Sequence, residues 1–248
     1  MTDANICRRA ALHEVALDAF ELSPARTVAE LAQACSLVHD AYVGLGIATP
    51  TPTGMLVSPS HLAHETVVFL ARARGRVVGT ISVIVDGPAG LPLEHDYPSE
   101  LATLRRHARR LAEIGSLAVV PDRRRSGVNA LLTMASLWAV QHVGAASHCV
   151  IGVHPRAIDY YRALYGFRQF GEPRGHCKLR APVAGLVLEV DRLEEHLRRA
   201  HPRPMASGRY VHEHTCRELP ACIVAPEVGC TRSRQGPRIA AVEHAASR

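Results

Sequence analysis

The chain has 248 residues, of which 47% are hydrophobic and 21% are charged. This length suffices for one large or two small domains with a substantial core, and the composition is too apolar for a generally disordered chain. No apolar run approaches the roughly 20 residues that span a bilayer, so no integral membrane segment is expected. The N-terminus carries early acidic residues and no clean apolar block, so we expect no secretory signal and a cytoplasmic location.

The formal net charge is +6, and almost all of the positive charge comes from arginine, which suits recognition of phosphate and carboxylate groups. A basic surface favours an acidic partner, such as a nucleotide cofactor, an anionic membrane or an acidic carrier protein. No zinc-finger spacing or helix-turn-helix signature is found, so no nucleic-acid partner is expected. The seven cysteines are odd in number and scattered, which argues against a disulfide framework.

The N-terminal half carries a helical pattern followed by strand patterns. Over residues 26–46 apolar side chains recur every three or four positions, which predicts an amphipathic helix. The ranges 65–73 and 76–86 are rich in β-branched residues, and the Arg-Gly turn between them predicts a hairpin. A loop over residues 87–98 follows, and residues 99–110 again show one apolar helical face.

The second half alternates strands and helices. The expected order is a strand (112–120), a basic turn (121–127), a buried helix (128–143), a strand (148–153), a helix from Pro155 to Gly166, and two strands (167–170 and 181–191). This order predicts an α/β fold with parallel pairing at the centre of its sheet.

The composition changes near both ends of the chain. We expect an N-terminal extension over residues 1–25, one folded domain over residues 26–197, and a C-terminal extension over residues 198–248 that is peripheral or partly disordered. This last segment includes His212 and Cys216, which are residue types that bind zinc. Its later cysteines lack the close paired spacing of structural zinc sites, so no metal is expected.

The basic turn before the buried helix carries the first chemical signal. Unpaired backbone amides and the helix dipole favour a bound anion at such a position. Arg123, Arg124 and Arg125 add positive charge. Gly127 lets a ligand approach the backbone closely. The alternative is a solvated charge run capped by Ser126, and the pattern taken alone does not separate the two interpretations.

The order of strand, anion turn, buried helix, strand and a tyrosine-containing helix that ends in Gly-Phe resembles the GNAT superfamily over roughly residues 26–191. The segments GLPLEHDYP, LRRHARRLAEIGSLAV and VHPRAIDYYRALYGF are similar to its N-acyl amino acid synthase branch, which is related in fold to the acyl-homoserine lactone autoinducer synthases. The resemblance implies an α/β (α+β) GNAT acyl-CoA N-acyltransferase fold with a mixed central sheet flanked by helices. It also implies an enzyme that moves a fatty acyl chain, usually from acyl carrier protein, onto the α-amine of an amino acid.

Two departures from acetyl-CoA enzymes bear on the donor. The cofactor turn of those enzymes usually ends in glycine or alanine, whereas Asn129 stands at that position here, and the tyrosine motif has one extra residue. A weakened pyrophosphate grip suits a phosphopantetheine arm on a carrier protein, because that arm has a single phosphate. Acyl carrier protein is therefore the expected donor, with acyl-CoA as the alternative, and arginine-rich surfaces would dock the acidic carrier. The resemblance assigns donor binding in this turn to Arg124, Arg125, Ser126 and Gly127.

The resemblance gives Glu113, at the start of the central strand, the position of the family's general base. An α-amine must lose a proton before it attacks a thioester, and a nearby carboxylate can accept that proton directly or through water. The alternative is a strand-end carboxylate paired with Arg109 or Arg110. The backbone amides of Leu117 and Val119 would pair with the pantetheine and polarise the thioester carbonyl.

Other side chains have roles that the sequence leaves open. Glu94 is a candidate for lining the acceptor site, with a solvated loop residue as the alternative. Tyr161 would protonate the leaving thiolate as general acid, but Tyr160 is not excluded, since tyrosines on an apolar helix face often belong to the core. Leu131, Ala135 and Trp138 either bound an acyl tunnel or pack in the core, and the core is the simpler interpretation.

Other classes of function also stay open. A CoA-dependent N-acetyltransferase of a small amine or peptide would have the same fold. A non-catalytic GNAT-fold module that binds a thioester ligand is the alternative outside the enzymes. The sequence sets neither the acyl chain length nor the identity of the amino acid acceptor.

Overall fold

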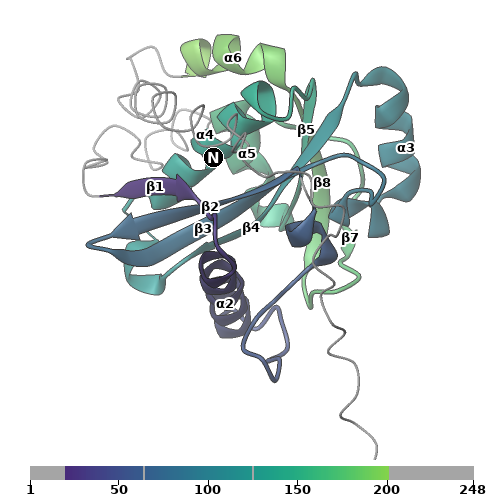
Figure 1. The fold of residues 1–248 in the computed structure, drawn as a ribbon. Helices are drawn as coiled ribbons and strands as arrows, with labels where there is room; N and C mark the ends of the chain where they lie inside the picture. Colours follow the sequence, from purple (N-terminus) through teal and green to yellow (C-terminus); the bar gives the residue numbers. More distant parts are fainter. Residues whose placement is uncertain (1–19, 64, 125, 201–248) are drawn as a thin grey trace, which may run out of the picture.

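The computed structural model describes residues 20–63, 65–124 and 126–200 (Figure 1). The strands in these ranges are β1 Glu21–Pro24, β2 Thr66–Ala73, β3 Arg76–Val85, β4 Leu111–Val119, β5 His148–Val153, β6 Arg168–Gln169, β7 Arg174–Gly175 and β8 Pro182–Glu189. The α-helices are α2 Val28–Gly44, α3 Pro98–His107, α4 Val128–His142, α5 Ile158–Tyr165 and α6 Leu193–Ala200. Short 3₁₀ helices are η2 Pro59–Leu62, η3 Pro92–His95, η4 Pro121–Arg123, η5 Pro155–Ala157 and η6 Val190–Arg192.

The strands pair in the order β1-β2-β3-β4-β5-β8-β6, and β7 also pairs with β8. β4 and β5 are parallel, and the other strand pairs are antiparallel. α4 lies between the two parallel strands in the sequence, as a parallel connection requires. The predicted mixed sheet, with its parallel pair at the centre and helices around it, is therefore confirmed.

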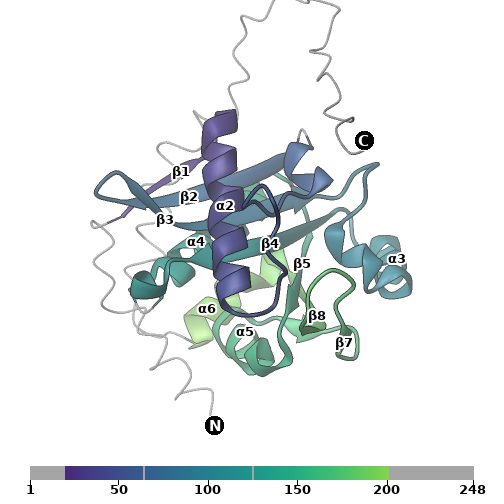
Figure 2. The same cartoon turned by 90° about the horizontal axis from the view of Figure 1, so that it is seen from below.

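Helices cover both faces of the sheet. Leu111 and Val150 pack in one cluster with Leu101 of α3. Their neighbours Ala112 and Cys149 pack instead in the large core that contains α4. Because successive side chains of a strand point to opposite faces, α3 and α4 lie on opposite faces. Figure 1 shows α5 and α6 on the side of α4, and Figure 2 shows α2 lying across β2, β3 and β4 on the other side.

The helix α2 begins at a capping box. The Thr27 hydroxyl accepts a hydrogen bond from the Glu30 amide, and the Glu30 carboxylate accepts one from the Thr27 amide, both at 3.2 Å. The helix lies within its predicted range. Its buried Val38 packs against Ala118 of β4, so the helix is fixed beside the central strand.

The predicted hairpin is formed by β2 and β3. Arg74 and Gly75 both have left-handed backbone conformations, with φ of 50° and 74°, as a tight two-residue turn requires. The following helix, α3, ends at His107, earlier than the predicted end at Arg110. Ala108 is already extended there, since the chain must turn into β4.

The strand β1 was not predicted. It pairs with β2 over Glu21–Pro24, within the range that the sequence assigned to an N-terminal extension. A four-residue strand that ends in proline has too little alternation to be recognised from the sequence. Residues 1–19 and 201–248 lie outside the described residues, and so does most of the predicted C-terminal extension.

Two irregularities in β4 open the centre of the sheet. Against β3, the two residues Ser116 and Leu117 stand opposite the single residue Ile81, which is a β-bulge. Against β5, the parallel pairing ends at Glu113 and Val150. Beyond that point β4 pairs only with β3, and β5 only with β8. The two central strands therefore separate next to the bulge.

Substitution of Leu132 tests the described core. This side chain of α4 is 0% exposed, and Leu132→Ala is expected to lower the free energy of unfolding by about 2–5 kcal/mol, because apolar contact is lost and a cavity is left. Leu45→Ala, at a residue that is 56% exposed, is the control and should change it by less than about 0.5 kcal/mol. Denaturant unfolding measures both variants, and equal losses would contradict the packing of α4.

Candidate active site

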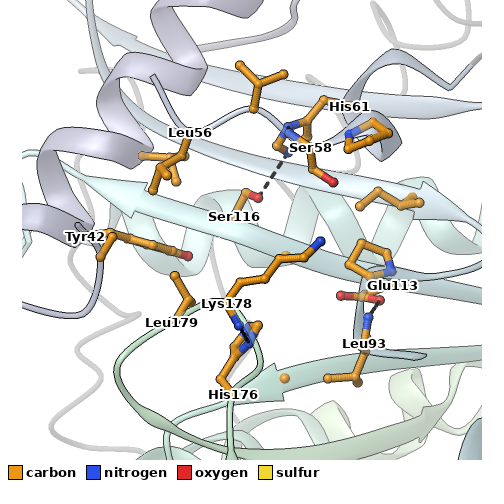
Figure 3. Close-up of a pocket in the computed structure, with 18 of the residues that line it drawn as sticks. Tyr42, Leu56, Ser58, His61, Leu93, Glu113, Ser116, His176, Lys178 and Leu179 are labelled. Carbon is orange, nitrogen blue, oxygen red and sulfur yellow. Dashed lines mark hydrogen bonds between the residues drawn. The ribbon is translucent and has the colours of Figure 1, made fainter. Parts of the chain in front are cut away.

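A cavity of about 370 Å³ lies beside β4, between α2, the segment that contains η2, and the loop before β8 (Figure 3). Its polar and charged lining side chains are Tyr42, Thr49, Ser58, His61, Glu113, Ser116, His176 and Lys178. Apolar lining side chains include Val38, Leu56, Val57, Ile84, Leu93, Ile114 and Leu179. A largely apolar hollow with a few convergent polar groups is typical of a small-molecule site.

Glu113 is buried at one side of this cavity. Its carboxylate accepts a hydrogen bond from the Leu93 amide at 2.8 Å (Figure 3). The alternative of a pair with Arg109 or Arg110 is not observed, since the Arg110 guanidinium binds Glu65 at 2.6 Å. Within the described residues, Glu113 forms no ion pair. Among the described residues, the carboxyl therefore has one neutral hydrogen-bond donor and no cation within ion-pair distance.

This environment changes the acidity of Glu113. Burial raises the pKa of its carboxyl to about 8, against the opposing effect of the Leu93 amide and with a further rise from the negative charge of Asp96. At pH 7 only about a tenth of the carboxyl is then ionised. The raised pKa makes the ionised carboxylate a stronger base toward an ammonium group than an ordinary glutamate is. This property suits a general base.

A smaller cavity of about 80 Å³ occupies the separation between β4 and β5. It is lined by residues 114–117 of β4, by residues 151–153 of β5, and by Tyr161 and Thr133 from helices on the opposite face. The residues that it shares with the larger cavity are Tyr42, Ile114, Gly115, Ser116 and Gly152. The two cavities therefore adjoin at the bulge, and together they reach from the α2 face to the α5 face.

The smaller cavity distinguishes the two candidate tyrosines. Tyr161 lines it and packs against Phe167 with ring centroids 5.9 Å apart, whereas Tyr160 lines neither cavity. Burial raises the pKa of Tyr161 above the ordinary tyrosine value, so its hydroxyl keeps its proton at neutral pH. Burial also raises the pKa of Tyr42 to about 12. The position favours Tyr161 as a proton donor, and Tyr42 presents a second protonated hydroxyl at the junction.

The other residues considered in the sequence analysis divide between the cavity lining and the core. Leu117 lines the smaller cavity, whereas Val119 is packed in the core. The expected contacts of their backbone amides with a thioester stay predictions. Leu131 and Ala135 are buried in the core, with the half-buried Trp138 packed against it, and line neither cavity, which supports the core interpretation of this helix.

The turn before α4 has a defined backbone conformation. Gly127 is the N-cap residue with φ of 84°, a left-handed conformation that favours glycine. The Ser126 hydroxyl donates to the Arg123 carbonyl at 2.7 Å, so it does not cap the helix as the alternative interpretation supposed. The exposed Arg124 donates a long bond of 3.5 Å to the last carbonyl of β4. Arg125 lies outside the described residues.

Glu94 lies away from Glu113. Its two carboxylate oxygens bind the Arg105 guanidinium at 2.7 and 2.8 Å, and Arg105 also binds Asp86. The hydrogen bonds from Arg105 lower the pKa of Glu94. Glu94 lines a separate surface pocket with Asp86 and Arg105. The structure therefore does not bring Glu94 into the cavity that was expected to bind the acceptor, and the ion pair accounts for its presence.

Three polar residues of the larger cavity were not predicted from the sequence. His61 Nε2 lies 3.1 Å from Ser116 Oγ, although the two residues are 55 positions apart. Lys178 is the only lysine in the chain, and Figure 3 shows its side chain directed into the cavity. A single lysine in an arginine-rich chain is the feature of the sequence that could have pointed to Lys178. The contact between His61 and Ser116 depends on tertiary packing and leaves no pattern in the sequence.

Asp96, His176 and Cys177 place three potential metal-ligand atoms within 4.8 Å of one another. His176 Nδ1 accepts a hydrogen bond from the Lys178 amide at 3.1 Å, and Asp96 Oδ1 accepts one from the Cys177 amide at 2.8 Å. These bonds fold the loop that carries Lys178 and engage the imidazole nitrogen nearest Asp96. We therefore assign no metal to this cluster. The histidines and cysteines after residue 201 lie outside the described residues.

A mixed sheet that opens between its central parallel strands, with a buried carboxyl beside the opening, is the arrangement expected of a GNAT-type N-acyltransferase. The family model described as N-acyl amino acid synthase FeeM matches residues 33–189, and the chain belongs to this family. It is an N-acyltransferase enzyme. None of the curated proteins matches the chain significantly.

Solved structures share the fold. FeeM, an N-acyl amino acid synthase from uncultured soil microbes, is 23% identical, with 74% of this chain and 98% of that chain covered and a TM-score of 0.65. The AHL synthase LasI is 15% identical, with 72% of this chain and 93% of that chain covered and a TM-score of 0.52. BjaI, a CoA-dependent acyl-homoserine lactone synthase, is 21% identical, with 72% of this chain and 90% of that chain covered and a TM-score of 0.50. In the described part of the chain, no helix is both long and apolar enough to span a bilayer.

The pH dependence of turnover tests the role of Glu113. A general base acts only when ionised, so kcat/KM is expected to rise with pH and to level off above about 8, where the raised pKa of this carboxyl in the free enzyme lies. Glu113→Gln should lose this rise together with most of its activity. Glu94→Gln is the matched control and should keep the profile, because its carboxylate is paired outside the cavity. A wild-type profile that is flat between pH 6 and 9 would contradict this role.

Proposed function

We propose that the protein transfers a long fatty acyl group from the phosphopantetheine thioester of acyl carrier protein to the α-amine of an amino acid. The product is an N-acyl amino acid. The observation that carries the proposal is the position of Glu113, an unpaired buried carboxyl in a cavity that adjoins the opening between β4 and β5. Membership of the N-acyl amino acid synthase family supports the same reaction.

In this reaction Glu113 takes a proton from the ammonium group of the acceptor, directly or through water. The neutral nitrogen then forms a bond to the thioester carbonyl carbon, and the carbonyl oxygen gains negative charge. Collapse of this intermediate breaks the carbon–sulfur bond, and Tyr161 protonates the departing thiolate. Of the three ammonium protons, one remains on the amide, one ends on the thiol by way of the enzyme, and one leaves to solvent.

Lys178 supports an amino acid as the acceptor. The α-carboxylate of an amino acid is two bonds from its amine, so a cation near the base that receives the proton would bind this carboxylate. The ammonium of Lys178 is directed into the cavity that contains Glu113 (Figure 3). Lys178 has no carboxylate partner in the described ranges. The carboxylate of the acceptor would supply this partner through a charge-assisted hydrogen bond.

The turn before α4 supports acyl carrier protein as the acyl donor. In our proposal its backbone amides and Arg124 bind the phosphate of the pantetheine arm, as do Arg125 and Ser126. The side chain of Asn129 occupies the position where acetyl-CoA enzymes usually have glycine or alanine, which disfavours a pyrophosphate. In our proposal the acyl chain passes through the opening between β4 and β5 into the larger cavity, beside the acceptor. The apolar side chains there, such as Leu56 and Ile84, suit a fatty chain better than an acetyl group.

The competing functions differ in measurable ways. BjaI shares the fold and is CoA-dependent, so acyl-CoA is the alternative donor, and comparison of acyl-CoA with acyl carrier protein at equal concentration separates the two. An acetyltransferase would prefer acetyl-CoA to both. A thioester-binding module would bind its ligand without turnover, and Glu113→Gln would leave that binding intact.

Lipid extracts from cells that overproduce the protein test the proposed reaction. Mass spectrometry is expected to reveal new N-acyl amino acids, and these should be absent from cells that produce Glu113→Gln. The Glu94→Gln variant serves as the matched control and should still give the products. If no N-acyl amino acid forms while all three proteins fold, the proposed acceptor and acyl chain are wrong.

Substitution of Lys178 tests how the acceptor is recognised. Lys178→Ala is expected to raise KM for the amino acid about tenfold, because one charge-assisted hydrogen bond is lost. KM for the corresponding amino acid carboxamide, which has no negative charge, should change less than about twofold. Arg180→Ala, in the same loop but outside the cavity lining, is the control. Equal effects on amino acid and carboxamide would show that Lys178 does not bind the carboxylate.

A further inference from the structure

Ser116 lies at the centre of the bulge in β4. Its φ of 52° is in the left-handed region, which costs free energy for a residue other than glycine. It lines both cavities, and the polar side chains that they share are those of Ser116 and Tyr42. The strained backbone therefore presents a hydroxyl at the place where the acceptor cavity meets the opening between the strands.

The hydrogen bonds of His61 define the direction of the Ser116 hydroxyl. His61 Nδ1 accepts a bond from the Ser58 amide at 3.1 Å, so this nitrogen carries no proton. Burial lowers the pKa of His61, which also favours the neutral ring. The proton is then on Nε2, which donates to Ser116 Oγ at 3.1 Å (Figure 3). Ser116 is the acceptor in this bond.

The remaining hydroxyl proton of Ser116 has no acceptor in the described part of the chain. With Nε2 of His61 donating to the oxygen, the proton must point elsewhere. A donated bond also polarises a hydroxyl and makes it a better donor. Ser116 is thus a fixed hydrogen-bond donor for a ligand atom at the junction of the two cavities.

The position of the junction identifies that ligand atom. In the proposed reaction the acceptor amine lies within reach of Glu113 and the thioester lies in the separation of β4 and β5, so their reacting atoms meet where the cavities adjoin. Ser116 is three residues after Glu113 on the same strand, on the side toward the donor turn. The carbonyl oxygen of the thioester is the atom of this junction that gains negative charge.

We propose that the Ser116 hydroxyl donates a hydrogen bond to the carbonyl oxygen of the thioester and stabilises the oxyanion of the tetrahedral intermediate. His61 is a positioning residue that directs this donor. When nitrogen bonds to the carbonyl carbon, the π electrons move to oxygen, and when the carbon–sulfur bond breaks they return. Ser116 keeps its proton throughout. This role rests on the proposed acyl transfer but not on the identity of the donor or the acceptor.

The test separates the hydroxyl from the backbone strain. Ser116→Gly relieves the left-handed conformation and removes the donor, and kcat is expected to fall by about 10²–10³ while KM for the acceptor stays within about threefold. Ser116→Asn tolerates the same φ and offers an amide donor, so it should recover part of the lost rate. Denaturant midpoints confirm that each variant folds. A Ser116→Gly enzyme with a kcat within threefold of wild type would overturn the proposal.

A double-mutant cycle tests the role of His61. His61→Ala is expected to lower kcat about tenfold in the wild-type background and to have no further effect in Ser116→Gly, because it acts through the hydroxyl. Independent, additive losses would overturn the positioning role. The cycle is run with whichever thioester and amine the wild type turns over. Failure of fatty acylation of amino acids would therefore refute the proposed function, while the result for Ser116 would still be read from the active pair.

Discussion

The site depends on the early end of the pairing between the two central strands. β4 and β5 pair only from Leu111 with His148 to Glu113 with Val150, and the bulge at Ser116 then turns β4 away. If β4 and β5 were paired along their whole length, their backbone groups would bond to each other and leave no space between the two strands. Because the strands separate, a cavity forms between them and adjoins the larger cavity on the α2 face. A thioester and an amine can then approach each other from opposite faces of one sheet.

The raised pKa of Glu113 depends on the pairing of nearby arginines with other carboxylates. Arg105 is bound to Glu94 and Asp86, and Arg110 to Glu65, so neither neutralises Glu113. A carboxyl without an ion-pair partner in an apolar site keeps its proton to higher pH, and its ionised form is a stronger base. A salt bridge at this position would stabilise the ionised form and make it a weaker base. In the proposed mechanism, the cost of burying Glu113 is thus what makes it an effective base.

Much of the fold was predictable because the patterns are local. The apolar periodicity of α2 and α4 and the turn at Arg74 and Gly75 gave the elements, and their order gave the parallel centre. Glu113 was predicted from its resemblance to the family's general-base position, which an acid at the start of an apolar strand supports. Glu94 was assigned to the acceptor site because the sequence does not show that Arg105 binds it. The His61–Ser116 contact joins residues 55 positions apart through a bulge, and no local pattern encodes it.

Acyl transfer at the junction of the two cavities is tested most directly by a crystal structure with a bound N-acyl amino acid product. The amide nitrogen is expected within hydrogen-bond distance of Glu113, directly or through one water. The amide oxygen should face the Ser116 hydroxyl, and the carboxylate should face Lys178. A product whose amide lies outside the separation of β4 and β5, away from Glu113 and Ser116, would contradict acyl transfer at this junction.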